Sequence, residues 1–129
     1  MSRIIKQTVT FKASPHDVYE VLMDSKKHAA FTGGKATISR KVGGTFSAYD
    51  GYITGKNIEL IQDKKIVQSW RAVDWPEGVF STVTFKFTPI PEGTRLDFTH
   101  MDVPDGTEEE FTQGWIDNYW ESMKVFFEK

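Results

Sequence analysis

The chain has 129 residues, of which 39% are hydrophobic and 14% aromatic, so we expect one globular domain with a core of its own. Its formal net charge of −2 provides no basic field, so neither nucleic acid nor an anionic membrane is expected as a partner. Cysteine is absent, which excludes disulfides, thiol catalysis and thiolate zinc sites. There is also no apolar run near the roughly 18 residues of a membrane span and no signal-peptide core, which favours a cytoplasmic protein.

The first part of the chain predicts a strand followed by short helices. Residues 4–11 alternate and carry β-branched side chains, as strands do. Ser14, Pro15 and Asp17 then mark a helix start, because serine caps helices, proline suits the first position and an acidic residue completes a capping box. The stretch 25–34 fits a second short helix that stops at its two glycines.

Residues 35–101 read as six strands separated by turns. The strand candidates are "ATISR", "GTFSAYD", "YITGKNIELI", "KIVQSWRAV", "VFSTVTFKF" and "TRLDFTHM". Turn signals recur about every ten residues, which predicts antiparallel neighbours in a meander.

The segment "TEEEFTQGWIDNYWESMKVFFEK" has the longest helical pattern in the chain. Thr107 and Glu110 are spaced as a second capping box. Two adjoining apolar stripes follow, the first at i, i+4 spacing: Phe111, Trp115, Tyr119 and Met123, then Ile116, Trp120 and Phe127. So wide an apolar arc predicts a helix gripped by a curved sheet rather than one laid on a flat surface.

Two polar residues share the inward face of the sheet with large apolar ones. Alternation turns Leu96, Phe98 and His100 inward, and placing Trp70 inward also turns Gln68 inward. These polar groups are either satisfied structural residues or the orienting groups of a ligand cavity. For the second alternative, the predicted cavity residues are Gln68, Trp70, Phe85, Phe98, His100, Trp115 and Tyr119.

A second tryptophan follows Trp70 in the stretch "SWRAVDWPEG". Because side chains alternate along an extended chain, a separation of five sends Trp70 and Trp75 to opposite faces. With Trp70 inward, Trp75 is expected near the hairpin mouth, where it caps the pocket entrance, packs on a loop or contacts a partner protein.

Motifs for catalysis or metal binding are absent from the sequence. The three histidines show no metal-ligand spacing, and neither a phosphate-binding glycine loop nor a G-x-S-x-G elbow occurs. Glu108, Glu109 and Glu110 suit a helix start better than a site. We therefore expect that the protein binds no metal or cofactor and is not an enzyme. A single histidine or tyrosine in a pocket can nevertheless suffice for catalysis.

The order and spacing of several modest motifs resemble one known family. These are the Gly43–Phe46 turn, the strand from Gly55 to Leu60, "IVQSWR" with "WPEG", and Gly114-Trp115 on the last helix. From about Ile4 to Phe127 the chain resembles the domain of activator of 90-kDa heat-shock protein ATPase homologues, of the START-like helix-grip (SRPBCC) superfamily. The resemblance implies an α+β fold in which a curved antiparallel sheet wraps around the C-terminal helix.

The resemblance leaves three functions open. The first is a non-enzymatic domain that holds a small apolar ligand between sheet and helix. The second is a co-chaperone module that binds a 90-kDa heat-shock chaperone and modulates its ATPase. In the eukaryotic co-chaperones a separate N-terminal domain makes the principal contact with the chaperone. This chain is therefore expected to bind weakly. The third is an enzyme that uses the same cavity.

Overall fold

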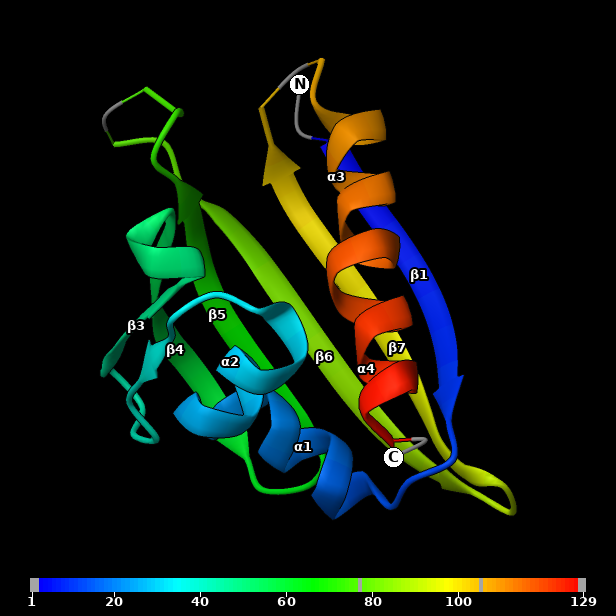
Figure 1. Cartoon of the computed structure of the whole chain (residues 1–129). Coiled ribbons are helices and arrows are strands. Elements are labelled where there is room, and N and C mark those ends of the chain that lie inside the picture. Colours follow the sequence, from blue (N-terminus) through cyan, green and yellow to red (C-terminus); the bar gives the residue numbers. More distant parts are fainter. Residues whose placement is uncertain (1–2, 77, 105, 128–129) are drawn as a thin grey trace.

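The computed structural model describes residues 3–76, 78–104 and 106–127. Within them, seven antiparallel strands form one sheet (Figure 1). The strands are β1 (Arg3–Phe11), β2 (Thr37–Ile38), β3 (Thr45–Ala48), β4 (Ile53–Ile61), β5 (Lys65–Ala72), β6 (Ser81–Ile90) and β7 (Gly93–Val103). Their order, β1-β7-β6-β5-β4-β3-β2, confirms the predicted meander, with β1 closing on the last strand.

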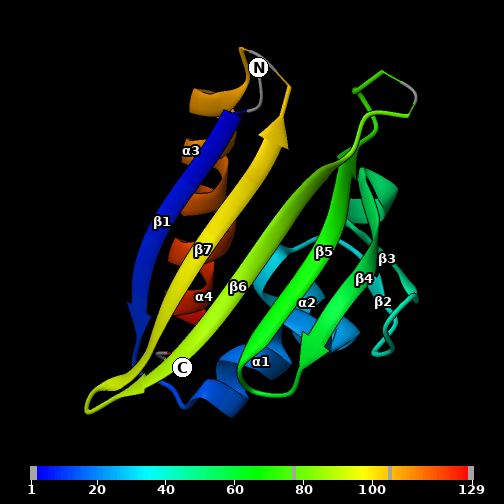
Figure 2. The same cartoon turned by 180° about the vertical axis from the view of Figure 1, so that it is seen from behind.

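The helices of the described residues all lie on one face of this sheet, and these residues place no helix on the other face (Figure 2). The short helices are α1 (Pro15–Met23) and α2 (Ser25–Thr32), and the predicted start of α1 and end of α2 are confirmed. The Ser14 hydroxyl accepts a hydrogen bond from the Asp17 N–H at 3.2 Å, and α2 ends at Gly33 in the left-handed conformation with φ 80°. A 3-10 turn, η1 (Tyr49–Gly51), links β3 to β4.

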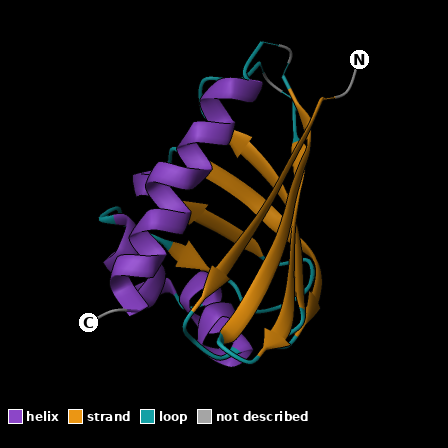
Figure 3. Ribbon diagram, turned by 90° about the vertical axis from the view of Figure 1, so that its right-hand side faces the viewer, coloured by secondary structure: helices purple, strands orange, loops and turns teal. Residues whose placement is uncertain are grey.

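The C-terminal helix runs along the concave face of the sheet (Figure 3) and consists of three consecutive parts. These are α3 (Glu108–Trp115), the π-helical η2 (Ile116–Trp120) and α4 (Glu121–Phe127). Its capping differs from the prediction. The Thr107 hydroxyl donates to the Pro104 carbonyl at 2.6 Å and does not cap the helix, so the second capping box is wrong. Thr107 lacks the extended backbone that a side-chain cap requires, with φ −107° and ψ 0°.

The π segment explains how Tyr119 and Trp120, which are neighbours in the helix, are both buried. In a π-helix the hydrogen bond spans five residues, and here the Glu121 N–H donates to the Ile116 carbonyl. Residues five apart therefore lie above one another, and the rings of Trp115 and Trp120 stack at 5.7 Å and 20°. Tyr119 is buried beside them.

The core lies between the concave sheet face and the helices, where the apolar residues predicted to face inward are found. Leu96 and Phe98 of β7 are buried, as are the alternate residues of β6. Phe98 contacts both helix tryptophans, with ring centroids 4.4 Å from Trp115 and 5.1 Å from Trp120. The predicted α+β fold, with a curved sheet gripping a long helix, is thus confirmed (Figure 3).

Candidate functional site

Gln68 points inward as predicted, and its partner is another buried amide. Its side-chain N–H donates to the Asn57 side-chain oxygen at 3.0 Å. The Asn57 NH₂ in turn donates to the carbonyls of Ser39 and Lys41 at 2.7 and 3.0 Å. Gln68 therefore helps to fix the connection between β2 and β3 against the sheet, which is a structural role.

His100 is completely buried and is held on both ring nitrogens. The Trp115 indole N–H donates to its Nδ1 at 3.0 Å, and its Nε2 lies 2.7 Å from the Ser81 hydroxyl. Burial lowers the pKa of His100 to about 3, so the ring is neutral at physiological pH.

The Ser81–His100 pair is not arranged for nucleophilic catalysis. An indole nitrogen can only donate, so the Nδ1 of neutral His100 accepts and its Nε2 carries the proton. Nε2–H then donates to Ser81, whose own hydroxyl donates to the Trp70 carbonyl at 3.0 Å. A general base must accept the serine proton, and this tautomer cannot do so.

The space enclosed among the predicted cavity residues is small. A void of about 20 Å³ lies beneath the helix, which is room for about one water molecule and far less than a ligand pocket. Phe98 and His100 do not line this void. The five predicted residues that do are Gln68, Trp70, Phe85, Trp115 and Tyr119. Aromatic side chains in mutual contact fill the remaining volume.

His28, which the sequence did not single out, also lines this void. Its Nε2 lies 3.0 Å from the Tyr119 hydroxyl, and its buried Nδ1 has no hydrogen-bond partner among the described residues. Burial lowers the pKa of His28 to about 4 and raises that of Tyr119. Both groups are therefore neutral at physiological pH.

The prediction that Trp75 faces away from Trp70 is wrong. Strict alternation ends with β5 at Ala72, and a turn follows in which the Trp75 N–H donates to the Ala72 carbonyl at 3.0 Å. The Trp75 ring returns to the inner side, with its centroid 5.5 Å from Trp70 and 5.6 Å from Phe111. It is only 7% exposed, so little of its surface is free for the predicted partner contact.

A larger opening lies where the sheet meets the C-terminal helix. This aromatic groove has a volume of about 360 Å³ and is open to solvent. Three of its residues belong to the predicted cavity set, Trp70, Trp115 and Tyr119. The other lining residues are Tyr49, Tyr52, Ile53, Glu110, Phe111, Gly114 and Asn118.

Tyrosine hydroxyls and carboxylates determine the electrostatics of the aromatic groove. The Tyr52 hydroxyl donates to an Asp74 carboxylate oxygen at 2.7 Å, and that hydrogen bond, with burial and the charges of Asp74 and Glu110, raises the pKa of Tyr52 to about 12. Burial raises the pKa of Tyr49 to about 12, and its hydroxyl donates to the Asn118 carbonyl at 3.3 Å. The tyrosines stay neutral, so the groove residues carry only negative charge.

Sequence reasoning missed the tyrosines of the aromatic groove. Tyr49 and Tyr52 flank Asp50-Gly51, which the sequence marks only as a turn between strands. In the structure Tyr49 has a left-handed backbone with φ 52°, rare for a bulky side chain. A pair of tyrosines around a tight turn was the available signal, but their distance from the helix depends on the folded sheet.

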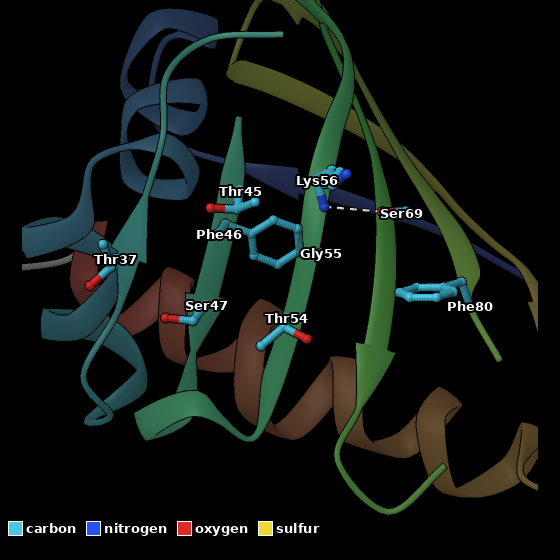
Figure 4. Close-up of a pocket in the computed structure, with 9 residues that line it drawn as sticks. All are labelled: Thr37, Thr45, Phe46, Ser47, Thr54, Gly55, Lys56, Ser69 and Phe80. Carbon is cyan, nitrogen blue, oxygen red and sulfur yellow. Dashed lines mark hydrogen bonds between the residues drawn. The ribbon is translucent and has the colours of Figure 1, made fainter. Parts of the chain in front are cut away.

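A second depression, the outer hollow, lies on the helix-free face of the sheet and has a volume of about 630 Å³ (Figure 4). Hydroxyl side chains of β2 to β5 line it together with one ammonium group and two phenylalanines, of which Phe46 is buried and Phe80 is exposed. The lining residues are Thr37, Thr45, Phe46, Ser47, Thr54, Gly55, Lys56, Ser69 and Phe80. Phe80 is 53% exposed, and its ring lies 5.9 Å from the Arg71 guanidinium.

The described part of the chain shows neither a metal site nor a membrane span. Within residues 3–76, 78–104 and 106–127, no three His, Asp or Glu side chains are grouped so as to hold a metal ion. In the same ranges, no helix has the length and apolarity needed to cross a bilayer.

Comparison with known proteins gives one consistent family. Residues 12–128 match the family model described as "Activator of Hsp90 ATPase homolog 1-like protein". The human "Activator of 90 kDa heat shock protein ATPase homolog 1" is 36% identical over 118 residues, which cover 92% of this chain and 35% of that protein. The Dictyostelium discoideum homologue is 34% identical over 130 residues, which cover 98% of this chain and 33% of that protein. The chain thus spans about a third of the length of these relatives.

Solved structures agree with this result. A crystal structure described as an HSP90 activator from Plasmodium falciparum superposes with a TM-score of 0.88 at 30% identity, covering 98% of this chain and 95% of that chain. The solution structure of the Aha1 dimer from Colwellia psychrerythraea shares the fold, with a TM-score of 0.83 at 20% identity over 97% of this chain and 96% of that one. The protein therefore belongs to the family of Activator of Hsp90 ATPase homolog 1-like proteins.

Proposed function

We propose that this chain is a non-enzymatic interaction domain that binds a 90-kDa heat-shock protein and modulates its ATPase. The carrying observation is the 36% identity to the human activator, which extends over 92% of this chain. The closely packed interior agrees with this proposal, because an interaction domain needs a rigid scaffold and an exposed surface rather than an internal pocket. The Ser81–His100 tautomer argues against the enzyme alternative.

The surface proposed for this contact is the outer hollow. Its walls offer hydroxyl donors and acceptors, the Lys56 ammonium and the exposed Phe80 ring (Figure 4). Val73, 63% exposed, is a further apolar side chain at the surface, in the connection between β5 and β6. Aromatic residues, phenylalanine included, are enriched at protein–protein interfaces. Arg71 holds this connection in place by donating to the carbonyls of Trp75 at 2.7 Å and Val79 at 3.1 Å.

The test is a titration of the domain against the 90-kDa heat-shock protein of its own organism, with complex formation and ATP turnover as readouts. We expect Phe80→Ser to weaken the complex about tenfold or more, because it removes an exposed aromatic anchor. Val42→Ser is the matched control, since Val42 is 63% exposed and does not line the outer hollow. If the wild-type domain forms no complex at high micromolar concentration and leaves turnover unchanged, the proposal fails. Equal losses for both variants would rule out the outer hollow.

A second candidate function is the binding of a small molecule in the aromatic groove. Its volume of about 360 Å³ lies within the range of small-molecule sites, whereas the enclosed void of about 20 Å³ does not. Six of the lining residues are aromatic, which suits an apolar or aromatic ligand: Tyr49, Tyr52, Trp70, Phe111, Trp115 and Tyr119. Because two tryptophans line the groove, tryptophan fluorescence reports directly on its occupancy.

A further inference from the structure

We infer that the aromatic groove binds an organic cation, namely an ammonium group carrying methyl or other small alkyl substituents. This inference rests on the second candidate function and names the class of ligand that the groove takes. Two observations support it independently: aromatic rings on both sides of the groove, and a charge distribution with one sign only.

The rings come from two elements that face each other. Tyr49, Tyr52 and Trp70 belong to the sheet side of the groove, and Phe111, Trp115 and Tyr119 belong to the helix side. Trp70 and Phe111 meet at 90° with centroids 5.5 Å apart, and Tyr49 and Tyr119 meet at 67° with centroids 6.2 Å apart. These contacts join the sheet side of the groove to its helix side, so aromatic side chains of both elements border one space. This is how aromatic cages recognise quaternary ammonium groups.

The charged groups favour a cation over a neutral or anionic ligand. Glu110 lines the groove, and Asp74 is held next to it by the Tyr52 hydroxyl at 2.7 Å. None of the described residues that line the groove is Lys, Arg or His. The positive end of the α3 dipole lies at this side, but three acidic residues in the first turn of the helix offset it. A fatty-acid carboxylate is therefore repelled, and an alkylammonium group is attracted.

The position of Gly114 provides a way to close the groove without disturbing the fold. Apart from the helix's own backbone, the one described atom within 4 Å of a Cβ at this residue would be the Asn118 side-chain nitrogen, at 3.8 Å. A larger side chain at position 114 therefore extends into the groove rather than into the core. Leucine also favours a helix more than glycine does, so Gly114→Leu is expected to fold.

The experiment compares choline with 3,3-dimethyl-1-butanol, its neutral carbon analogue, by tryptophan fluorescence and NMR chemical-shift titration. We expect choline to bind about tenfold more tightly than the neutral analogue, since only the cation interacts favourably with the ring faces and the carboxylates. Gly114→Leu should abolish binding. Glu110→Gln should weaken choline binding severalfold, whereas Glu109→Gln, which removes the same charge outside the groove lining, should leave it unchanged.

Other outcomes separate this inference from the proposal on which it rests. Equal binding of choline and its neutral analogue, blocked by Gly114→Leu, would overturn the cation preference but retain the groove as a ligand site. If neither compound binds at millimolar concentration, the cation inference and the second candidate function are both overturned. An added titration with N-acetyl-trimethyllysine amide distinguishes a free small molecule from a modified protein side chain. Binding of either cation more tightly than the neutral analogue supports the inference. A preference for choline or for the trimethyllysine compound identifies which of the two kinds of ligand the groove takes.

Discussion

At the scale of single residues, the interior combines aromatic packing with a few polar groups. His100 joins the helix to the sheet, through Trp115 on one ring nitrogen and Ser81 on the other. Alternation along β5 and β7 predicted that Gln68 and His100 face inward. It could not predict their partners, because Asn57 and Ser81 lie on other strands whose register forms only in the folded sheet.

The inward position of the Trp75 ring can be tested by measuring the stability of a variant. Trp75→Ala should lower the free energy of unfolding by about 3–5 kcal/mol, because it removes a large buried ring that contacts Trp70 and Phe111. Val73→Ala, at an exposed position two residues away, should change it by about 0.5 kcal/mol or less. Urea denaturation followed by far-UV circular dichroism measures both. Similar small effects for the two variants would mean that Trp75 is exposed in solution.

At the scale of the elements, caps and alternation predicted most of the fold. The start of α1 and the end of α2 follow from Ser14 and Gly33 alone. The π segment did not follow from the sequence, because the apolar stripes fit an ordinary α-helix equally well. Burying both Tyr119 and Trp120 against the sheet requires the wider turn, and that requirement arises from tertiary packing.

The close pairing of β4 and β5 yields a second prediction, at Gly55. A Cβ there would lie 1.9 Å from the Ser69 carbonyl oxygen and 2.7 Å from Cε2 of the Phe46 ring. The carbonyl belongs to the backbone, so the strands themselves must shift. We expect Gly55→Ala to lower the free energy of unfolding by about 1–3 kcal/mol. Gly114→Ala is the matched control. It should raise the free energy of unfolding by up to about 1 kcal/mol, because alanine has a higher helix propensity than glycine. A Gly55→Ala variant as stable as the wild type would contradict the observed strand spacing.

At the scale of the whole molecule, the C-terminal helix lies along the concave face of the sheet, beside α1 and α2 (Figure 1). The sequence predicted this arrangement, and it also predicted a ligand cavity among the residues beneath the helix. The size of a cavity depends on small differences between the volume enclosed by the backbone and the volume of the side chains. Trp115, Phe98 and Trp120 pack closely enough to leave a void of about 20 Å³. The larger open space lies instead in the aromatic groove, between η1 and the C-terminal helix.

Two buried neutral histidines make the stability of this molecule depend on pH. Burial lowers the pKa of His28 to about 4 and that of His100 to about 3, against an unfolded value of 6.5. Between pH 6.5 and pH 4 the unfolded chain binds protons at both residues while the folded chain does not, so stability falls as pH falls. Their described hydrogen-bond partners are Tyr119 for His28, and Ser81 and Trp115 for His100. None of these is an acidic group that could stabilise the charged imidazolium.

The expected loss between pH 7 and pH 5 is about 3–4 kcal/mol, since each histidine contributes up to about 1.4 kcal/mol per pH unit within this window. Urea denaturation at intervals of half a pH unit measures it. His28→Phe should reduce the slope to about half, because one titrating group is removed and an apolar ring of similar size replaces it. Trp75→Ala is the control: it should lower stability at every pH and leave the slope unchanged. A flat profile from pH 7 to pH 5 would show that the folded protein takes up protons at these histidines, and would thus contradict their burial as neutral side chains beneath the helix.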